Sequence, residues 1–202
     1  MIDMNGYNEV NAANHGENSK KLPAGGYVCK ILEVTPKKSK AGRAMLVLNV
    51  DIAEGEFRGY FTEQHSRSQE FNPDAFYPSA ATYYQLIYQN DSDKISPYFK
   101  GLITTIERSN NCKLNIKDKF DEQELKGKIC GFIFADEEYT RNDGKVIVAP
   151  RIKFPKSADD IRQNKFTVPE MKKATETPTQ SEKAVDPMAK NAVEVSDSDL
   201  PF

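Results

Sequence analysis

The stretch KICGFIFADEEYTRNDGKVIVAPRIKF, from Lys128 to Phe154, predicts two strands and the turn that joins them. Its first part, over 128–138, contains a nearly continuous apolar run, which is typical of a buried strand. Residues 141–145 read Arg-Asn-Asp-Gly-Lys, and the Asp-Gly pair favours a tight hairpin turn. A second strand follows from Val146 to Phe154, where Pro150 indicates a bulge or a sheet edge. The segment therefore predicts a β-hairpin with one strand in the core.

Three further strands are expected upstream of this hairpin. The first, from Tyr27 to Thr35, follows a turn that contains Pro23, Gly25 and Gly26. The second, from Ala44 to Ile52, has apolar residues at every other position, which gives it a clear inward face. The third is expected from Tyr60 to His65.

Helices are expected between the third strand and the hairpin, and after the hairpin. Apolar residues at helical spacing over 80–87 predict one of them. Another should begin after Ser96-Pro97, because Ser is a good N-cap and Pro is favoured in the first helical turn, and it should end at Asn110. Ser157 is expected to cap a short helix that ends near Gln163.

This order of elements predicts a mainly β fold with a helical insertion, of the α+β class. Three strands, a helical insertion and a two-stranded hairpin are the order of an OB-fold, a five-stranded barrel that binds oligonucleotides. Another small barrel or a different α+β domain remains an alternative. We expect the OB-like domain at 22–172, a flexible N-terminal segment at 1–21 and a disordered acidic tail at 173–202.

Composition limits the classes of protein that remain. The chain has 202 residues, 38% of them hydrophobic, and no long apolar run, so we expect no membrane span and a location in the cytoplasm of a bacterial host cell. The three cysteines, Cys29, Cys112 and Cys130, form no CxxC pair, and His15 and His65 complete no zinc pattern. We therefore expect no metal and no cofactor, and we expect Cys29 and Cys130 to be buried small hydrophobes.

Charge is distributed unevenly along the chain. Residues 174–202 carry six acidic and two basic side chains, which leaves 26 basic and 24 acidic residues over 1–173. An acidic tail on a slightly basic body suits a nucleic-acid-binding domain that also recruits other proteins.

The chain ends in Asp197-Ser198-Asp199-Leu200-Pro201-Phe202. A partner can bury the Phe202 ring in an apolar pocket and hold its free carboxylate with Arg or Lys, while Pro201 lowers the entropy lost on docking. The acidic residues steer the tip toward basic surfaces. This end resembles the C-terminal tip of bacterial and phage single-stranded DNA-binding proteins. The predicted partner-binding residues are Asp197, Asp199, Leu200, Pro201 and Phe202.

Four internal segments carry a second resemblance: Leu22 to Tyr27, Asp51 to Phe57, Phe99 to Thr104 and Ile106 to Asn110. They look like a family of phage and mobile-element proteins of low-GC Gram-positive bacteria. Members of that family are associated with single-stranded DNA binding in replication or recombination. The resemblance implies a protein that coats exposed strands and recruits a helicase, a primase or a recombinase mediator, with homo-oligomers possible.

Binding of single-stranded DNA requires cations for phosphates and flat side chains for bases. Cations are expected in the first hairpin loop, in the last hairpin loop and on the fifth strand, where basic residues share one parity and apolar residues, including Ile152 and Phe154, share the other. Stacking candidates lie near the ends of predicted strands. The DNA-binding candidates are Lys37, Lys38, Lys40, Arg43, Tyr60, Phe61, Tyr139, Arg141, Lys145, Arg151 and Lys153.

Two other functions stay open at this point. A nuclease could bind Mg²⁺ through Asp51, Glu54 and Glu56 or through the acidic run at 136–138, although neither set lies in a recognisable motif. A protein adaptor could use the tail without touching DNA. The interpretation favoured by the sequence is a non-enzymatic single-stranded DNA-binding protein.

Overall fold

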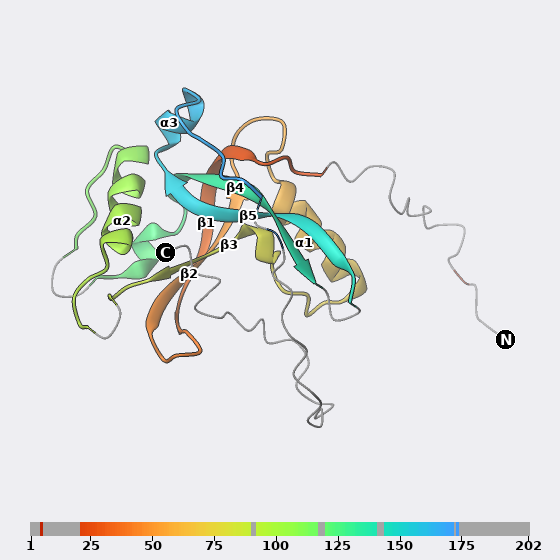
Figure 1. Cartoon of the computed structure of the whole chain (residues 1–202), viewed down its shortest axis with the longest axis horizontal. Coiled ribbons are helices and arrows are strands. Elements are labelled where there is room, and N and C mark those ends of the chain that lie inside the picture. The colour runs from red at the N-terminus through yellow and green to blue at the C-terminus, as the bar shows by residue number, and fades with distance from the viewer. Residues whose placement is uncertain are drawn as a thin grey trace.

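The structure is a computed structural model, and it describes residues 5, 21–89, 92–116, 120–140, 144–171 and 173. Within these residues the protein is mainly β, with a five-stranded antiparallel sheet and three α-helices (Figure 1). Most of the predicted N-terminal segment and nearly all of the predicted tail lie outside the described residues. No helix of the described part is long and apolar enough to cross a membrane.

The sheet has the strand order β3-β2-β1-β4-β5, and neighbouring strands are all antiparallel. The long central strand pairs with β2 along its C-terminal part and with β4 along its N-terminal part. The two outer strands are edges, so the sheet formed by the described residues is open. The strands are β1 (Gly25–Lys38), β2 (Ala44–Ile52), β3 (Thr82–Leu86), β4 (Ile129–Thr140) and β5 (Val146–Lys156).

Two of the sequence predictions are wrong: a helix occurs where a strand was predicted, and a strand occurs where a helix was predicted. The segment predicted as a strand from Tyr60 is helix α1 (Tyr60–Phe71), and the third strand, β3, lies where a helix was predicted. Helix α1 follows Gly59, which has φ of 79° and offers no side-chain cap. Its cap comes instead from Asp51 on β2, whose carboxylate accepts hydrogen bonds from the backbone N–H groups of Phe61 (3.0 Å) and Thr62 (3.1 Å).

The other two helices are confirmed. Helix α2 (Pro97–Ser109) begins at Ser96, whose hydroxyl accepts from the Tyr98 N–H, and it is followed by Asn110. The Asn110 side chain donates to the Ile129 carbonyl and accepts from the Ile129 N–H, which joins the end of α2 to β4. Helix α3 (Ala158–Arg162) begins at Ser157 as predicted. Two short 3-10 turns, η2 (Ser79–Ala81) and η3 (Glu122–Leu125), complete the described elements.

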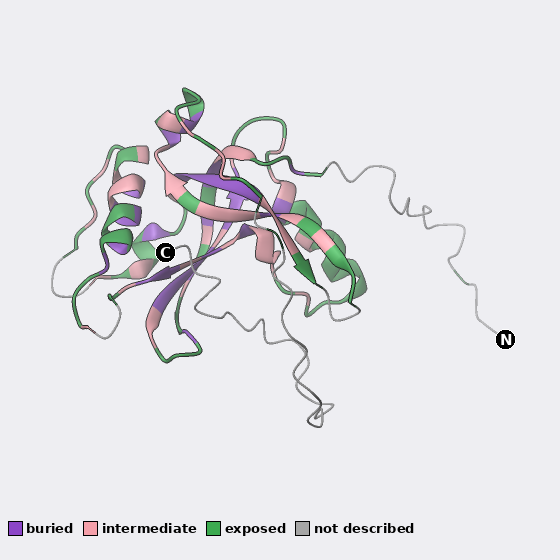
Figure 2. Cartoon of the chain, in the orientation of Figure 1, coloured by how far each residue is buried: buried purple, intermediate pink, exposed green. Residues whose placement is uncertain are grey.

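The core lies on both faces of the sheet (Figure 2). The larger cluster fills the inner face, where side chains of β1, β2, β3 and β4 pack with α1 and α2. A smaller cluster on the other face places α3 against Val28 and Ile133. Gly131 permits this approach, because a Cβ there would lie 2.7 Å from the carbonyl oxygen of Lys156 and 2.5 Å from the Ile161 side chain.

The prediction for the two strand cysteines is confirmed. Cys29 and Cys130 are free thiols with no exposed surface, and they lie opposite each other in the β1–β4 pairing. Burial raises the pKa of both thiols well above the ordinary value. They serve as core residues and are poor nucleophiles in the folded protein.

Candidate nucleic-acid interface

The first group of predicted cations lies at the β1–β2 hairpin. Lys37 and Lys38 end β1, Lys40 lies in the turn, and all three are exposed, while Arg43 is half-buried. The turn is fixed by backbone bonds from the Ser39 N–H to the Arg43 carbonyl (2.8 Å) and from the Gly42 N–H to the Ser39 carbonyl (2.9 Å). The hairpin therefore presents three ammonium groups on a defined turn.

The second group lies on the β4–β5 hairpin. The guanidinium of Arg151 lies 5.5 Å from the centre of the Tyr139 ring, a cation–π contact across the two strands. The Lys153 Nζ is 2.8 Å from a carboxylate oxygen of Glu137. Lys145 is exposed just before β5, whereas Arg141 lies outside the described residues. The fold thus brings Tyr139, Arg151 and Lys153 together on one hairpin.

The two cationic hairpins lie at opposite ends of the sheet along the strand direction. This follows from the pairing, because β1 is antiparallel to both β2 and β4 and leads into the first hairpin at its C-terminal end, whereas β4 leads into the second at the end near Gly25. Figure 1 shows the two hairpin ends well separated, with the sheet between them.

The sheet surface next to the first hairpin, over β2 and β3, has regular cross-strand rows. In one row Lys37, Met45 and Leu86 are neighbours, and in the next Val47 pairs with Tyr84. Met45, Val47 and Leu86 are buried and form a small cluster with half-buried Tyr84. This cluster is separate from the main core, and the sequence reasoning assigned Tyr84 to a helix and therefore missed it.

The three predicted stacking residues have different surroundings. Tyr139 is 37% exposed, which leaves part of its ring accessible. Tyr60 is half-buried and packs edge-on against Phe57 and Phe61, with ring centres 6.0 and 5.0 Å away. Phe61 is 1% exposed, and its ring stacks on Phe134 at 5.8 Å. The stacking prediction for Phe61 is therefore corrected, because its ring is part of the core.

A second correction concerns the faces of β5. The register of β4 against β5 shifts between Ile133 and Phe134. No residue of β4 therefore stands directly opposite Lys153 in the strand pairing, and Phe154 stands opposite Ile133. This bulge places Phe154 on the face opposite to that of Ile152, whose partner is Phe134. Phe154 is 38% exposed and does not share the face of Ile152 that alternation predicted for both.

The acidic residues considered as Mg²⁺ ligands are engaged in other contacts. The Asp51 carboxylate accepts three backbone hydrogen bonds, from Ile52, Phe61 and Thr62, at 2.8 to 3.1 Å. Glu54 forms a two-bond ion pair with Arg162, and the hydrogen bond from Arg162 lowers the pKa of Glu54. Within the described residues no group of three or more His, Cys, Asp or Glu side chains is placed to hold a metal ion.

Comparison with known proteins gives no family for this chain: no family model matches it, and neither does any curated protein. Function must therefore be inferred from the chemistry of its own residues.

Proposed function

We propose that this protein is a non-enzymatic single-stranded DNA-binding protein, whose body coats exposed strands and whose C-terminal tip recruits replication or recombination enzymes. The observation that carries the proposal is the connectivity of the sheet. In an OB-fold the first strand pairs with both the second and the fourth, and a helix lies between the third and the fourth. The same pairing of β1 and the same position of α2 occur here, although the sheet is open between β3 and β5.

The positions of the cations support the same function. Lys37, Lys38 and Lys40 lie at one end of the sheet, and Arg151 and Lys153 lie on the hairpin that leads to the other end. A single strand that runs past α3, which covers Val28 and Ile133 on the sheet face between the two hairpins, would meet positive charge at both ends of its path. The partly exposed ring of Tyr139, next to Arg151, offers a surface on which a base can stack.

The acidic tip supplies the second half of the proposal. It lies outside the described residues, so its role rests on its sequence, with the aromatic ring of Phe202 and acidic residues before it. A partner with an apolar pocket and a basic rim would bind it.

Salt dependence tests the DNA-binding half. A triple variant, Lys37→Ala, Lys40→Ala and Arg43→Ala, should bind an oligo(dT) more weakly and should lower the slope of log affinity against log salt by about 2, since each lost phosphate contact is worth about 0.7. The control removes three charges from exposed lysines elsewhere, Lys94, Lys126 and Lys165, and should keep the slope. Binding should favour single strands over duplex. No binding at low salt would refute the function.

Truncation tests the recruitment half. Deleting 197–202, or changing Phe202→Ala, should abolish capture of a host helicase, primase or recombination mediator while affinity for single-stranded DNA stays the same or rises. A rise is expected because a tethered acidic segment competes with phosphates for the basic surface. Loss of DNA binding together with partner binding would show that the tip is not an independent recruitment arm. Partner capture by a protein that never binds DNA would favour the adaptor function.

A further inference from the structure

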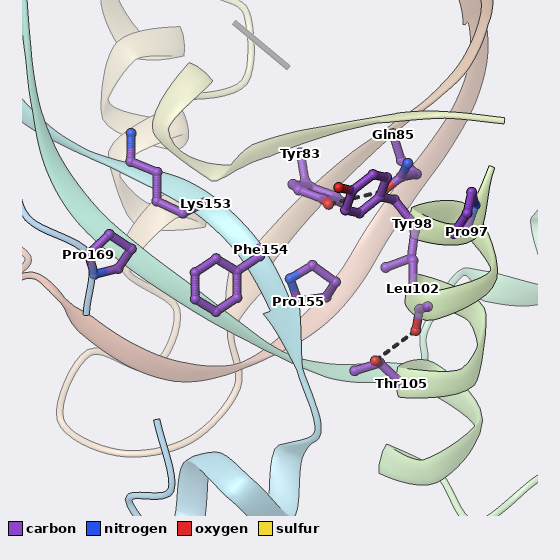
Figure 3. A pocket seen from close by; sticks show the side chains of 11 residues that line it. Tyr83, Gln85, Pro97, Tyr98, Leu102, Thr105, Lys153, Phe154, Pro155 and Pro169 are labelled. Carbon is purple, nitrogen blue, oxygen red and sulfur yellow. Dashed lines mark hydrogen bonds between the residues drawn. The ribbon is translucent and has the colours of Figure 1, made fainter. Parts of the chain in front are cut away.

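A groove of about 510 Å³ lies where the sheet is open. Residues of β3, of β5 and of the exposed side of α2 line it, and Pro169 lies at one end (Figure 3). Its floor contains the buried Tyr83 and Gln85, whose side chains are hydrogen-bonded to each other at 3.1 Å. The polar side-chain atoms of the floor therefore already have hydrogen-bond partners within the protein. A ligand in the groove would be bound by its walls and rim.

The walls carry flat apolar groups. Phe154 and Pro155 come from β5, and Tyr98 and Pro97 come from the start of α2 (Figure 3). Tyr98 is 58% exposed and Phe154 is 38% exposed. Phe154 makes no ring contact with another aromatic residue of the described chain. Part of each ring is therefore exposed to solvent at the border of the groove.

The groove is continuous with the cationic surface described above. Lys153, which belongs to the proposed phosphate-binding residues of β5, also lines the groove. Its ammonium group has three donors, and the ion pair with Glu137 at 2.8 Å uses one of them. A strand that follows Arg151 and Lys153 along β5 therefore reaches the two exposed rings next.

We propose that this groove is a second stacking site for the single strand, in which Phe154 and Tyr98 contact bases and Lys153 contacts the phosphate that precedes them. The inference rests on the proposed function and extends its footprint beyond the sheet surface. A proline-rich peptide is the main competing ligand, because such peptides also bind aromatic grooves. The shared Lys153 favours the nucleic acid, because an ammonium group at the border of the groove can bind a phosphate.

Oligonucleotides of two lengths test the proposal. An oligo(dT) of about 8 nucleotides can fill one site, whereas one of about 24 can cover the sheet and the groove. Phe154→Ala and Tyr98→Ala should each weaken binding of the long oligonucleotide by about 5- to 150-fold per lost base stack and leave the short one unchanged. Phe76→Ala is the matched control, since that ring is 65% exposed and does not line the groove.

A pair of substitutions at Gly101 separates charge from shape. Gly101 lines the groove from α2, and a Cβ there would have open space around it. Gly101→Gln and Gly101→Glu both replace a mid-helix glycine with a good helix former, so neither should lower the melting temperature. Gly101→Glu should weaken binding of the long oligonucleotide about fivefold more than Gly101→Gln, because it places a carboxylate near phosphates.

The outcomes distinguish the two levels of the proposal. If the unmodified protein binds neither oligonucleotide, the proposed function itself fails. If it binds both, and the ring variants bind the long one as tightly as the unmodified protein, only the groove proposal is overturned. Equal weakening for both lengths also overturns it, because a separate second site would spare the short oligonucleotide. A proline-rich peptide that binds, and is lost on Phe154→Ala while DNA affinity is kept, would identify a peptide groove instead.

Discussion

Asp51 should be one of the most sensitive positions in the chain, because it supplies the N-terminal cap of a helix that has none of its own. The residue is 6% exposed, and its carboxylate accepts hydrogen bonds from the backbone N–H groups of Ile52 (2.8 Å), Phe61 (3.0 Å) and Thr62 (3.1 Å). Asp51→Ala removes both acceptor oxygens, and with them all three hydrogen bonds, and leaves buried N–H groups without this partner. Loss of an N-cap costs about 0.5–2 kcal/mol, and an unsatisfied buried donor costs about 1–3 kcal/mol. We expect a total of about 2–4 kcal/mol.

Thermal unfolding followed by circular dichroism measures this effect. For a domain of this size a loss of 2–4 kcal/mol corresponds to a fall of about 4–16 °C in melting temperature. Asp51→Asn should lose about half as much, because an amide oxygen can still accept two of the bonds while its NH₂ group faces a donor. Asp93→Ala removes the same charge from an exposed position and is the control. If Asp51→Ala stays within about 0.5 kcal/mol of this control, the assignment of the cap is wrong.

Three further predictions concern the β1–β4 region. Gly131→Ala should destabilise the protein by about 1–3 kcal/mol, since its Cβ would meet a backbone carbonyl at 2.7 Å, and a neutral result in denaturant unfolding would contradict the tight packing of α3. In the native state a thiol reagent should label half-buried Cys112 quickly and label the fully buried Cys29 and Cys130 only on unfolding; fast labelling of all three would show that the core opens. Because burial raises the folded-state pKa of both thiols, the unfolded chain loses their protons at a lower pH than the folded protein does, so the free energy of unfolding should fall as pH rises above about 8.5. In a Cys29→Ala, Cys130→Ala variant the free energy of unfolding should fall less steeply with pH. An equal slope in both proteins would assign the effect to other groups.

Much of the fold could be predicted from local signals. Three patterns of a few residues each predict one element: the alternation in β2, the apolar run in β4 and the Ser-Pro start of α2. All three elements occur in the structure. Helix α1 carries no such signal: its cap is a glycine without a side chain, and Phe61 is its only buried residue. The helix exists because a carboxylate ten residues earlier in the chain binds its first turn.

Strand β3 was mispredicted for a different reason, because its local pattern resembles that of a helix. Its two adjacent tyrosines match helical spacing with their neighbours, and its inward positions include a polar residue, Gln85. Gln85 is fully buried because its amide oxygen accepts from the Tyr83 hydroxyl and its NH₂ donates to the Leu86 carbonyl. A polar residue that is satisfied by its own strand breaks the alternation on which strand prediction depends.

In the candidate site, too, some features could be predicted from the local sequence and others could not. Exposure of the lysines in the first hairpin could be predicted, because a polar turn between two strands faces solvent. The exposure of Phe154 and the contact between Arg151 and Tyr139 could not, because both depend on the register of β4 against β5 and on one bulge within it. A single inserted residue reverses the face of every side chain that follows it.

The two prolines of β5 have a consequence for how this protein behaves at high concentration. An open sheet exposes an outer strand whose free backbone groups can pair with another molecule, and long flat edges of this kind promote fibril growth. Strand β5 is an edge of eleven residues, but Pro150 and Pro155 lack the N–H group and interrupt its row of donors. The opposite edge, β3, is only five residues long. Neighbouring copies can therefore be crowded together without their sheets joining into a continuous one.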